Sequence, residues 1–233
     1  MMHKFGLTLR VCIAFWLASR YTFLFYTLLL TMVAAPLLGA FGFNGMPILQ
    51  IFISVNLAAA LAGITNRRWA HLLLAIFIIA FTVHFYADYI NVQKLVVASS
   101  VVLVILAFIA ASDAVWVSMK SSEITGEHLY AALSAYMLAG IFFGVLHWTV
   151  GRMWPGAYIV PEGGAFSLHD GIYFSFVTQA TLGYGDVLPK SEIARGLSIV
   201  QAVAGQFYLA VMVARLVSLY VSNAATESKS KRF

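Results

Sequence analysis

The feature that most constrains this chain is a series of long apolar runs that contain almost no charged residues. A run of about 17–25 apolar residues crosses a bilayer as a helix, because the hydrocarbon core is about 30 Å thick and a helix rises about 1.5 Å per residue. Only 10% of the 233 residues are charged, whereas about 25% are charged in a soluble domain. The chain is therefore predicted to be an all-α membrane protein.

Six such runs are present, at residues 21–41, 47–64, 69–87, 95–114, 128–150 and 193–221. The first 20 residues mix basic and aromatic side chains, which suits a cytoplasmic segment that lies along the membrane surface. The end of the chain is polar and basic, and we expect it to be a disordered cytoplasmic tail. The chain is accordingly divided into residues 1–20, a four-helix transmembrane domain at 21–120, a second membrane domain at 121–221 and the tail at 222–233.

The orientation follows from the lysines and arginines of the short loops, because loops rich in these residues stay in the cytoplasm. With both termini cytoplasmic, ten of the 14 basic residues lie inside and four lie outside. We therefore predict a multi-pass protein of the cell (inner) membrane of a prokaryote, in contact with membrane lipids. Charged residues are too few to form a nucleic-acid groove, so nucleic acid is not an expected partner.

A segment of another kind, residues 151–189, lies between the fifth and sixth runs; it is rich in Gly and Pro and contains Thr-Leu-Gly-Tyr-Gly-Asp at 181–186. Non-helical backbone is tolerated at membrane depth only where it is buried in protein or lines a water-filled path. A ring of backbone carbonyls replaces the hydration shell of a cation. Gly183 and Gly185 free the backbone to aim successive carbonyls at one axis, where a Cβ is expected to clash. Leu182 and Tyr184 are expected to pack behind this strand.

A helix of half the usual spanning length is expected just before this sequence. Ser167 followed by Asp170 is a capping-box pattern that starts a helix, and the helix is expected to end near Gln179. Its C-terminal carbonyls carry the negative end of the helix dipole and favour a cation just beyond them. Ser191 is the expected N-cap of the last helix.

The sequence at 181–186 resembles the selectivity-filter signature of potassium channels, T-x-G-Y-G-D, and the order of elements over about residues 128–221 is similar to the pore module of that family, bacterial members included. The resemblance implies a homotetramer, with the second membrane domain as its pore domain. Potassium ions are expected at a filter made of Thr181, Leu182, Gly183, Tyr184 and Gly185. Asp186 is expected to brace the filter from behind, and Val177 stands where some bacterial members carry a glutamate that holds this aspartate.

Candidate gating residues lie in the last run. Gly205 is either a hinge for a gate or a point of close packing against the half-length helix. Ala210, Val213 and Val217 share a face below it, and either form a hydrophobic constriction that gates by dewetting or contact lipid and other helices. His147, at the outer end of the fifth run, either senses external pH or makes an interfacial hydrogen bond.

The resemblance implies a potassium-selective channel that conducts passively, needs no cofactor beyond the permeant ion and is not an enzyme. The fourth run lacks the series of arginines that a voltage sensor needs, so voltage gating is not expected. The alternatives are a non-conducting or weakly selective cation channel subunit and a membrane enzyme. The enzyme is disfavoured because the histidines are scattered and form no Ser–His or metal constellation at helical spacing.

Overall fold

The computed structural model of the chain describes residues 19–41, 45–64, 67–120, 126–161 and 164–230. The regular secondary structure of the described part is helical except for one pair of two-residue strands, β1 and β2, which pair antiparallel. In chain order the elements are α2 (Arg20–Ala40), α3 (Gly45–Ala62), α4 (Arg67–Tyr89), α5 (Gln93–Lys120), α6 (Gly126–Met153), β1 (Tyr158–Ile159), α7 (Leu168–Gln179), β2 (Leu188–Pro189) and α8 (Glu192–Ser230).

The length and apolar character of the helices are those of a multi-pass membrane protein. Each of the six apolar runs falls on one helix, from α2 to α6 and on α8. Four stretches are long and apolar enough to cross a membrane: Arg68–Tyr89, Gln93–Lys120, Gly126–Met153 and Glu192–Arg215. Two further apolar helices, over Arg20–Ala34 and Ile48–Ala62, are shorter.

The expectation of a disordered tail after residue 221 is wrong for the part that the structure describes, because α8 continues to Ser230. The sequence Asn-Ala-Ala-Thr-Glu-Ser-Lys at 223–229 contains neither Gly nor Pro, and Ala, Glu and Lys favour a helix. The extra turns are therefore consistent with local helix propensity. Residues 1–18 and 231–233 lie outside the described residues.

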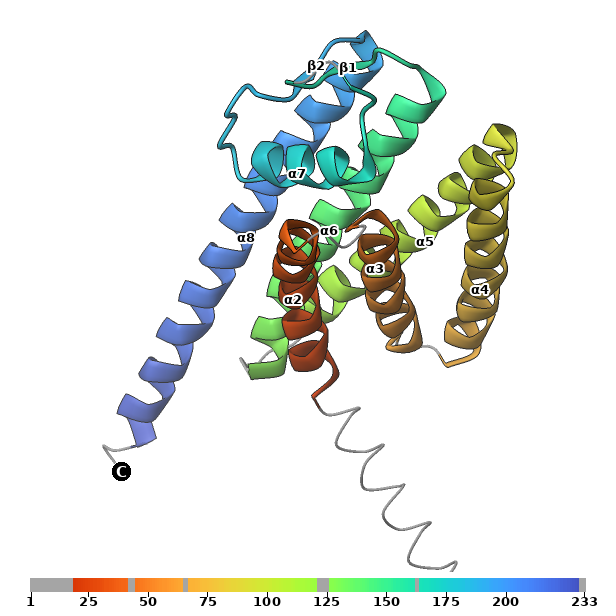
Figure 1. The fold of residues 1–233 in the computed structure, drawn as a ribbon. Helices are drawn as coiled ribbons and strands as arrows, with labels where there is room; N and C mark the ends of the chain where they lie inside the picture. Colours follow the sequence, from red (N-terminus) through yellow and green to blue (C-terminus); the bar gives the residue numbers. More distant parts are fainter. Residues whose placement is uncertain (1–18, 42–44, 65–66, 121–125, 162–163, 231–233) are drawn as a thin grey trace, which may run out of the picture.

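Helix α6 lies at the centre of the molecule and contacts α2, α5, α7 and α8 (Figure 1). Two of its glycines, Gly140 and Gly144, allow α7 to come close. A Cβ at Gly140 would lie 2.5 Å from the Phe176 ring, and one at Gly144 would lie 2.8 Å from the Ile172 Cα. Small residues four apart on a membrane helix permit this kind of approach. The position of α7 is therefore fixed by the shape of α6.

The start of α6 is tied to the start of α2. The Glu127 carboxylate accepts hydrogen bonds from the Tyr21 amide at 3.1 Å and from the Thr22 hydroxyl at 2.5 Å. It thus satisfies amide donors that a helix leaves unpaired at its N-terminus. The second membrane domain and the four-helix domain share this cap.

Helix α8 stands apart from the four-helix domain, and its principal contacts are with α6, α7 and β2 (Figure 1). Beyond those contacts it exposes an apolar surface that includes Ile199, Val203, Phe207, Val213 and Val217. Figure 1 shows α7, β1 and β2 gathered at one end of the molecule, with the C-terminus at the other. The end that carries α7 is called the filter end below.

Candidate functional site

Helix α7 begins as the sequence predicts, with a capping box. The Ser167 hydroxyl accepts from the Asp170 amide at 3.2 Å, and the Asp170 carboxylate accepts from the Ser167 amide at 2.8 Å. The helix ends at Gln179, also as predicted. Ser191 caps α8 in the same way, with its hydroxyl accepting from the Ala194 amide at 3.2 Å.

The chain reverses direction at the end of α7 and leaves it as irregular backbone. The Leu182 amide donates to the Val177 carbonyl at 2.9 Å, and the Thr181 amide donates to the Thr178 carbonyl at 3.1 Å. Three alternate residues then hold positive φ angles: Thr181 at 57°, Gly183 at 57° and Gly185 at 80°. Alternation between left-handed and ordinary backbone turns successive peptide planes, which is the requirement for carbonyls that share one direction.

The two glycines meet this requirement for a reason different from the one expected. A Cβ on Gly183 or Gly185 would meet no atom of this chain within 4 Å, so no clash arises inside the chain. The restriction comes from the positive φ angle itself, which residues with a Cβ adopt only at a cost. Thr181 adopts it despite its branched side chain, which marks the segment as strained.

Leu182 and Tyr184 do not pack behind the strand within one chain. Their exposed fractions are 56% and 67%. An apolar and an aromatic side chain that are exposed side by side on a membrane protein need a partner from outside this chain or from lipid. The expected packing is therefore absent from the single chain.

Asp186 is held from behind by Tyr173 of α7. The Tyr173 hydroxyl donates to the Asp186 carboxylate with an oxygen–oxygen distance of 2.6 Å, and the Val187 amide donates to the same side chain at 2.9 Å. The bond from the Tyr173 hydroxyl is the main cause that lowers the pKa of Asp186 below its ordinary value. The same bond raises the pKa of Tyr173 to about 12.

Val177 does not contact the Asp186 side chain through any hydrogen bond, and its own side chain is buried with an exposed fraction of 7%. Its carbonyl accepts the Leu182 amide that starts the irregular segment. The partner of Asp186 thus lies one helical turn earlier, at Tyr173, and it is a neutral hydroxyl instead of a carboxylic acid. No sequence signal at Val177 pointed to this pairing.

A buried polar cluster lies on the other side of α7, with Gln201 of α8 at its centre. The Gln201 amide nitrogen donates to the Ser175 carbonyl at 2.9 Å and to the Ser175 hydroxyl at 2.6 Å. The Ser175 hydroxyl donates to the Gly140 carbonyl at 2.6 Å. Gln201, Ser175 and His147 are all completely buried. Helices α6, α7 and α8 therefore meet through one set of hydrogen bonds.

His147 belongs to this cluster and is buried deep in it. Its Nε2 lies 2.9 Å from the Gln201 Oε1, and its Nδ1 lies 2.6 Å from the Tyr158 hydroxyl. Because the Gln201 oxygen only accepts, Nε2 carries the proton and Nδ1 accepts from the Tyr158 hydroxyl. The hydrogen-bonded reading of His147 fits this geometry, and a solvent-exposed pH sensor does not.

Gly205 lies against the end of α7. A Cβ there would be 2.9 Å from the Gln179 Cγ and 3.0 Å from the Gln179 carbonyl oxygen. Helix α8 runs through this position without interruption. Ala210, Val213 and Val217, further along α8, are exposed in the single chain. The structure thus supplies a close-packing role for Gly205 and leaves the face of the other three open.

Comparison with known proteins supports the same segment. Residues 131–222 match the family model described as "Ion channel". The chain is 29% identical over 92 residues to "Two pore potassium channel c" of Oryza sativa subsp. japonica, which is 39% of this chain and 18% of that protein. This segment is therefore similar to ion channels and, at 29% identity, to a potassium channel. No solved structure gives a significant match.

A second relative, "Two-pore potassium channel 3" of Arabidopsis thaliana, is 28% identical over 102 residues, which is 44% of this chain and 22% of that protein. The chain therefore spans less than a quarter of the length of these curated relatives. The likeness to the potassium channel family is confined to the pore domain.

Sequence analysis missed the residues that hold α7 and the segment after it. Tyr173 and Gln201 carry no motif in the sequence, and only their three-dimensional neighbours reveal that Tyr173 bonds to Asp186 and Gln201 to Ser175. One signal was available: Gly140 and Gly144 form a small-x-x-x-small pattern that predicts a close helix partner. That pattern would have placed α7 against α6.

Proposed function

We propose that this protein is the subunit of a homotetrameric, potassium-selective channel that conducts potassium ions passively. Carbonyls of Thr181, Leu182, Gly183 and Tyr184, together with the Thr181 hydroxyl, line the ion sites, and Gly185 completes the turn. Each chain supplies one strand, and four strands around an axis complete the ring. No organic cofactor takes part and no bond of a substrate is broken.

The single observation that carries this proposal is the backbone of the Thr-Leu-Gly-Tyr-Gly-Asp segment. It follows the C-terminus of a half-length helix and has positive φ at Thr181, Gly183 and Gly185. Strain of this kind persists only where the surrounding structure holds it. A hydrogen bond fixes each end of the segment. At one end the Leu182 amide donates to the Val177 carbonyl, and at the other the Tyr173 hydroxyl donates to Asp186.

The uncovered surfaces support an oligomer. Tyr184 in the filter segment and Phe207 on α8 have exposed fractions of 67% and 68%. Both belong to the part of the chain that faces away from the four-helix domain. Neighbouring subunits around a common axis would cover the filter side chains, and Ala210, Val213 and Val217 would then face the axis below the filter as a candidate gate.

The membrane arrangement that fits this function has six spans, both termini in the cytoplasm and the filter end outside. The described helices α2 to α6 and α8 supply six apolar segments. Helix α5 contains Lys94, Asp113 and Lys120 as its only charged residues and no arginine. Voltage is therefore not the proposed stimulus for opening.

Rubidium uptake into vesicles with purified protein, with sodium as competitor, tests the proposal. Wild type should take up rubidium and exclude sodium. Gly183→Ala should abolish this selectivity, because alanine at φ 57° is strained. Gly196→Ala is the matched control: it adds the same methyl group in α8, where nothing lies within 4 Å and φ is ordinary.

Size-exclusion chromatography of both variants separates loss of selectivity from loss of assembly. Normal selectivity in Gly183→Ala would contradict the filter assignment. Absence of flux in wild type, with assembly intact, would favour the non-conducting subunit, and equal uptake of rubidium and sodium would favour the weakly selective one.

A further inference from the structure

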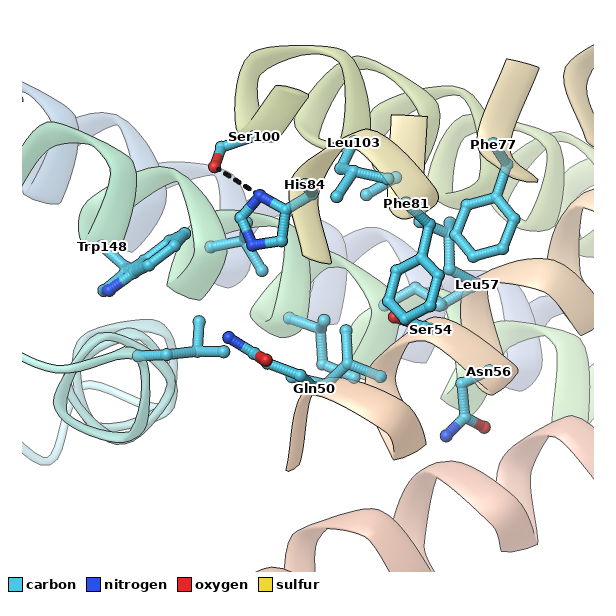
Figure 2. Close-up of a pocket in the computed structure, with 16 residues that line it drawn as sticks. Gln50, Ser54, Asn56, Leu57, Phe77, Phe81, His84, Ser100, Leu103 and Trp148 are labelled. Carbon is cyan, nitrogen blue, oxygen red and sulfur yellow. Dashed lines mark hydrogen bonds between the residues drawn. The ribbon is translucent and has the colours of Figure 1, made fainter. Parts of the chain in front are cut away.

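Two hollows meet at the filter end, between the four-helix domain and the pore domain. One is an apolar cavity of about 60 Å³ among α3 to α7, shown in Figure 2. The other is a crevice of about 790 Å³ formed by the ends of α4 and α6 and by the chain around β1. Gln50 and Trp148 line both hollows, so the crevice and the cavity adjoin at these two side chains.

The crevice carries one negative and one positive side chain that pair poorly. Arg152 Nη2 lies 3.9 Å from Asp88 Oδ1, which is too long for a hydrogen bond. The Arg152 Nε is buried and has no hydrogen-bond partner among the described residues. The Arg152 guanidinium also lies over the Trp148 ring, 5.7 Å from its centre. Both charges therefore keep capacity for a ligand.

The cavity behind Trp148 is mostly apolar, and the polar side chains of His84 and Gln50 lie at one end of it. His84 Nδ1 lies 3.1 Å from the Ser99 hydroxyl, and no partner is found for its Nε2 in the described part of the chain. Figure 2 shows His84, Gln50 and Trp148 around this end of the cavity. The remaining walls are largely apolar and include Leu57, Phe77, Phe81, Leu138 and Ile141.

We propose that this pair of hollows binds a phospholipid with a primary-amine head group, such as phosphatidylethanolamine. Its phosphate accepts hydrogen bonds from Arg152, whose planar fork suits phosphate. Its ammonium group donates to Asp88. A short stretch of one acyl chain enters the apolar cavity past Trp148, and the rest of the lipid stays in the bilayer.

The charge balance of the crevice residues that the structure describes favours this head group among membrane lipids. Asp88 and Arg152 together have no net charge, which matches a zwitterion better than an anionic head group. A choline head group has the same charges but no N–H to donate to Asp88, whereas a primary ammonium has three donors. A trimethylated head group should therefore bind more weakly.

The site also touches the pore domain at the start of α7. Ser167, the N-cap of α7, lines the crevice, and Leu168, the first residue of α7, lines the cavity. Bound lipid therefore contacts the start of the helix that holds the filter. The binding site itself does not depend on conduction, and its test is independent of the proposed channel function.

Native mass spectrometry of protein purified from vesicles with equal parts of phosphatidylethanolamine, phosphatidylcholine and phosphatidylglycerol tests the site. Wild type should retain phosphatidylethanolamine about fivefold over either of the others, which corresponds to one hydrogen bond of about 1 kcal/mol. Asp88→Asn leaves a single positive charge and should shift the preference to phosphatidylglycerol. Arg152→Gln should lose bound lipid.

Glu192→Gln and Arg195→Gln are matched controls, because these two charged residues lie at the same end of the molecule in a separate pair, 3.2 Å apart. Equal retention of the three lipids by wild type, or a loss in the controls as large as in the crevice variants, would overturn the proposal. Hydrogen exchange of wild type covers the case of a variant that fails to fold. Phosphatidylethanolamine should protect residues 148–160 more than phosphatidylcholine does, and equal protection would also overturn the site.

Discussion

Thr181, Gly183 and Gly185 share a left-handed backbone, but the energetic cost of that backbone differs between threonine and glycine. The glycines adopt positive φ freely, whereas Thr181 at 57° has a branched side chain that resists it. Such a residue costs about 1–3 kcal/mol and persists because its neighbours hold it. The hydrogen bonds from the Thr181 and Leu182 amides to the last turn of α7 supply that hold. Thr181 is kept in place by the end of α7.

The hydrogen bond from Tyr173 to Asp186, at the far end of the filter segment from Thr181, can be tested by changing the pH. Tyr173→Phe removes the hydroxyl that lowers the pKa of Asp186, so this pKa should rise toward its ordinary value of 3.8. A depressed folded-state pKa stabilises the fold above the ordinary value, and this stabilisation is lost as pH falls through the depressed pKa. Rubidium flux at filter-side pH from about 3 to 6 should therefore fall at a higher pH in Tyr173→Phe than in wild type.

The control is Tyr89→Phe, since Tyr89 has an exposed fraction of 82%. The acid limb of flux should not move in this variant. Identical acid limbs in Tyr173→Phe and wild type would show that Asp186 is held by other contacts.

The sequence predicted the local part of this site and missed the long-range part. The capping box depends on Ser167 and Asp170, which are three residues apart, and the end of α7 at Gln179 depends on a short run of residues. Both can therefore be read from the sequence. Tyr173 and Asp186 are 13 residues apart, and their contact depends on how the chain reverses after α7. That reversal is set by backbone angles that no residue type specifies alone.

At the scale of the elements, α7 is clamped between α6 and α8 by two different kinds of contact. Gly140 and Gly144 of α6 admit it by shape, and Gln201 of α8 bonds to it through Ser175. Hydrogen bonds inside a membrane protein have no water to replace them when they break. The pore helix is therefore specified more tightly than a purely apolar contact would allow.

Removal of the central amide should weaken this clamp. Gln201→Leu leaves the His147 Nε2 proton and the Ser175 carbonyl without their buried partner, at about 1–3 kcal/mol per group. Thermal unfolding in detergent should occur at a lower temperature, and potassium-over-sodium selectivity should fall.

Gln206→Leu is the matched control on the same helix, because its side chain is exposed and its bond to the Gln179 carbonyl is long, at 3.5 Å. Its unfolding temperature should stay near that of wild type. An equal fall in unfolding temperature in both variants would mean that the buried cluster stabilises the fold no more than the exposed Gln206 side chain does.

Substitution of Gly205 distinguishes a packing role of this residue from a hinge role. Gly205→Ala places a methyl group 2.9 Å from the Gln179 side chain, and overpacking of this kind costs about 1–3 kcal/mol. We expect a lower unfolding temperature and reduced selectivity. In Gly196→Ala the same change should raise helix stability by up to about 1 kcal/mol. Unchanged or higher stability in Gly205→Ala, with altered opening, would favour the hinge.

At the scale of the elements, two helices also extend beyond the predicted spans. Residue 221 was taken as the end of the last span because the apolar character stops there, yet α8 continues to Ser230. Hydropathy reports the part of a helix that lies in lipid and not the end of the helix. Likewise α5 extends to Lys120, beyond the expected end at residue 114.

At the scale of the whole molecule, the four-helix domain and α8 lie on different sides of α6 and make few contacts with each other. The four-helix domain contacts α7 mainly through α6, and directly where α3 meets α7. The fold class and the order of the elements could be read from apolar runs and one motif. The arrangement of α2 to α5 around α6 could not, because apolar helices in lipid have no strong preference for one partner.

This arrangement predicts weak voltage dependence. Helix α5 has no arginine series to move through the field, and each elementary charge contributes about 2.3 kcal/mol per 100 mV. Open probability in planar bilayers should change little with potential. A steep activation curve, equivalent to many gating charges per assembly, would contradict the prediction, and a known voltage-gated channel in the same bilayers serves as the control.

The cap that Glu127 places on α2 has a consequence for exchange of parts between channels. A chimaera that joined the pore domain of this chain to the first helices of another would place Glu127 beside a foreign helix start, in place of the Tyr21 and Thr22 amides that it accepts from here. The two domains are separable in sequence but not at this junction. A transplant would have to carry Tyr21, Thr22 and Glu127 together.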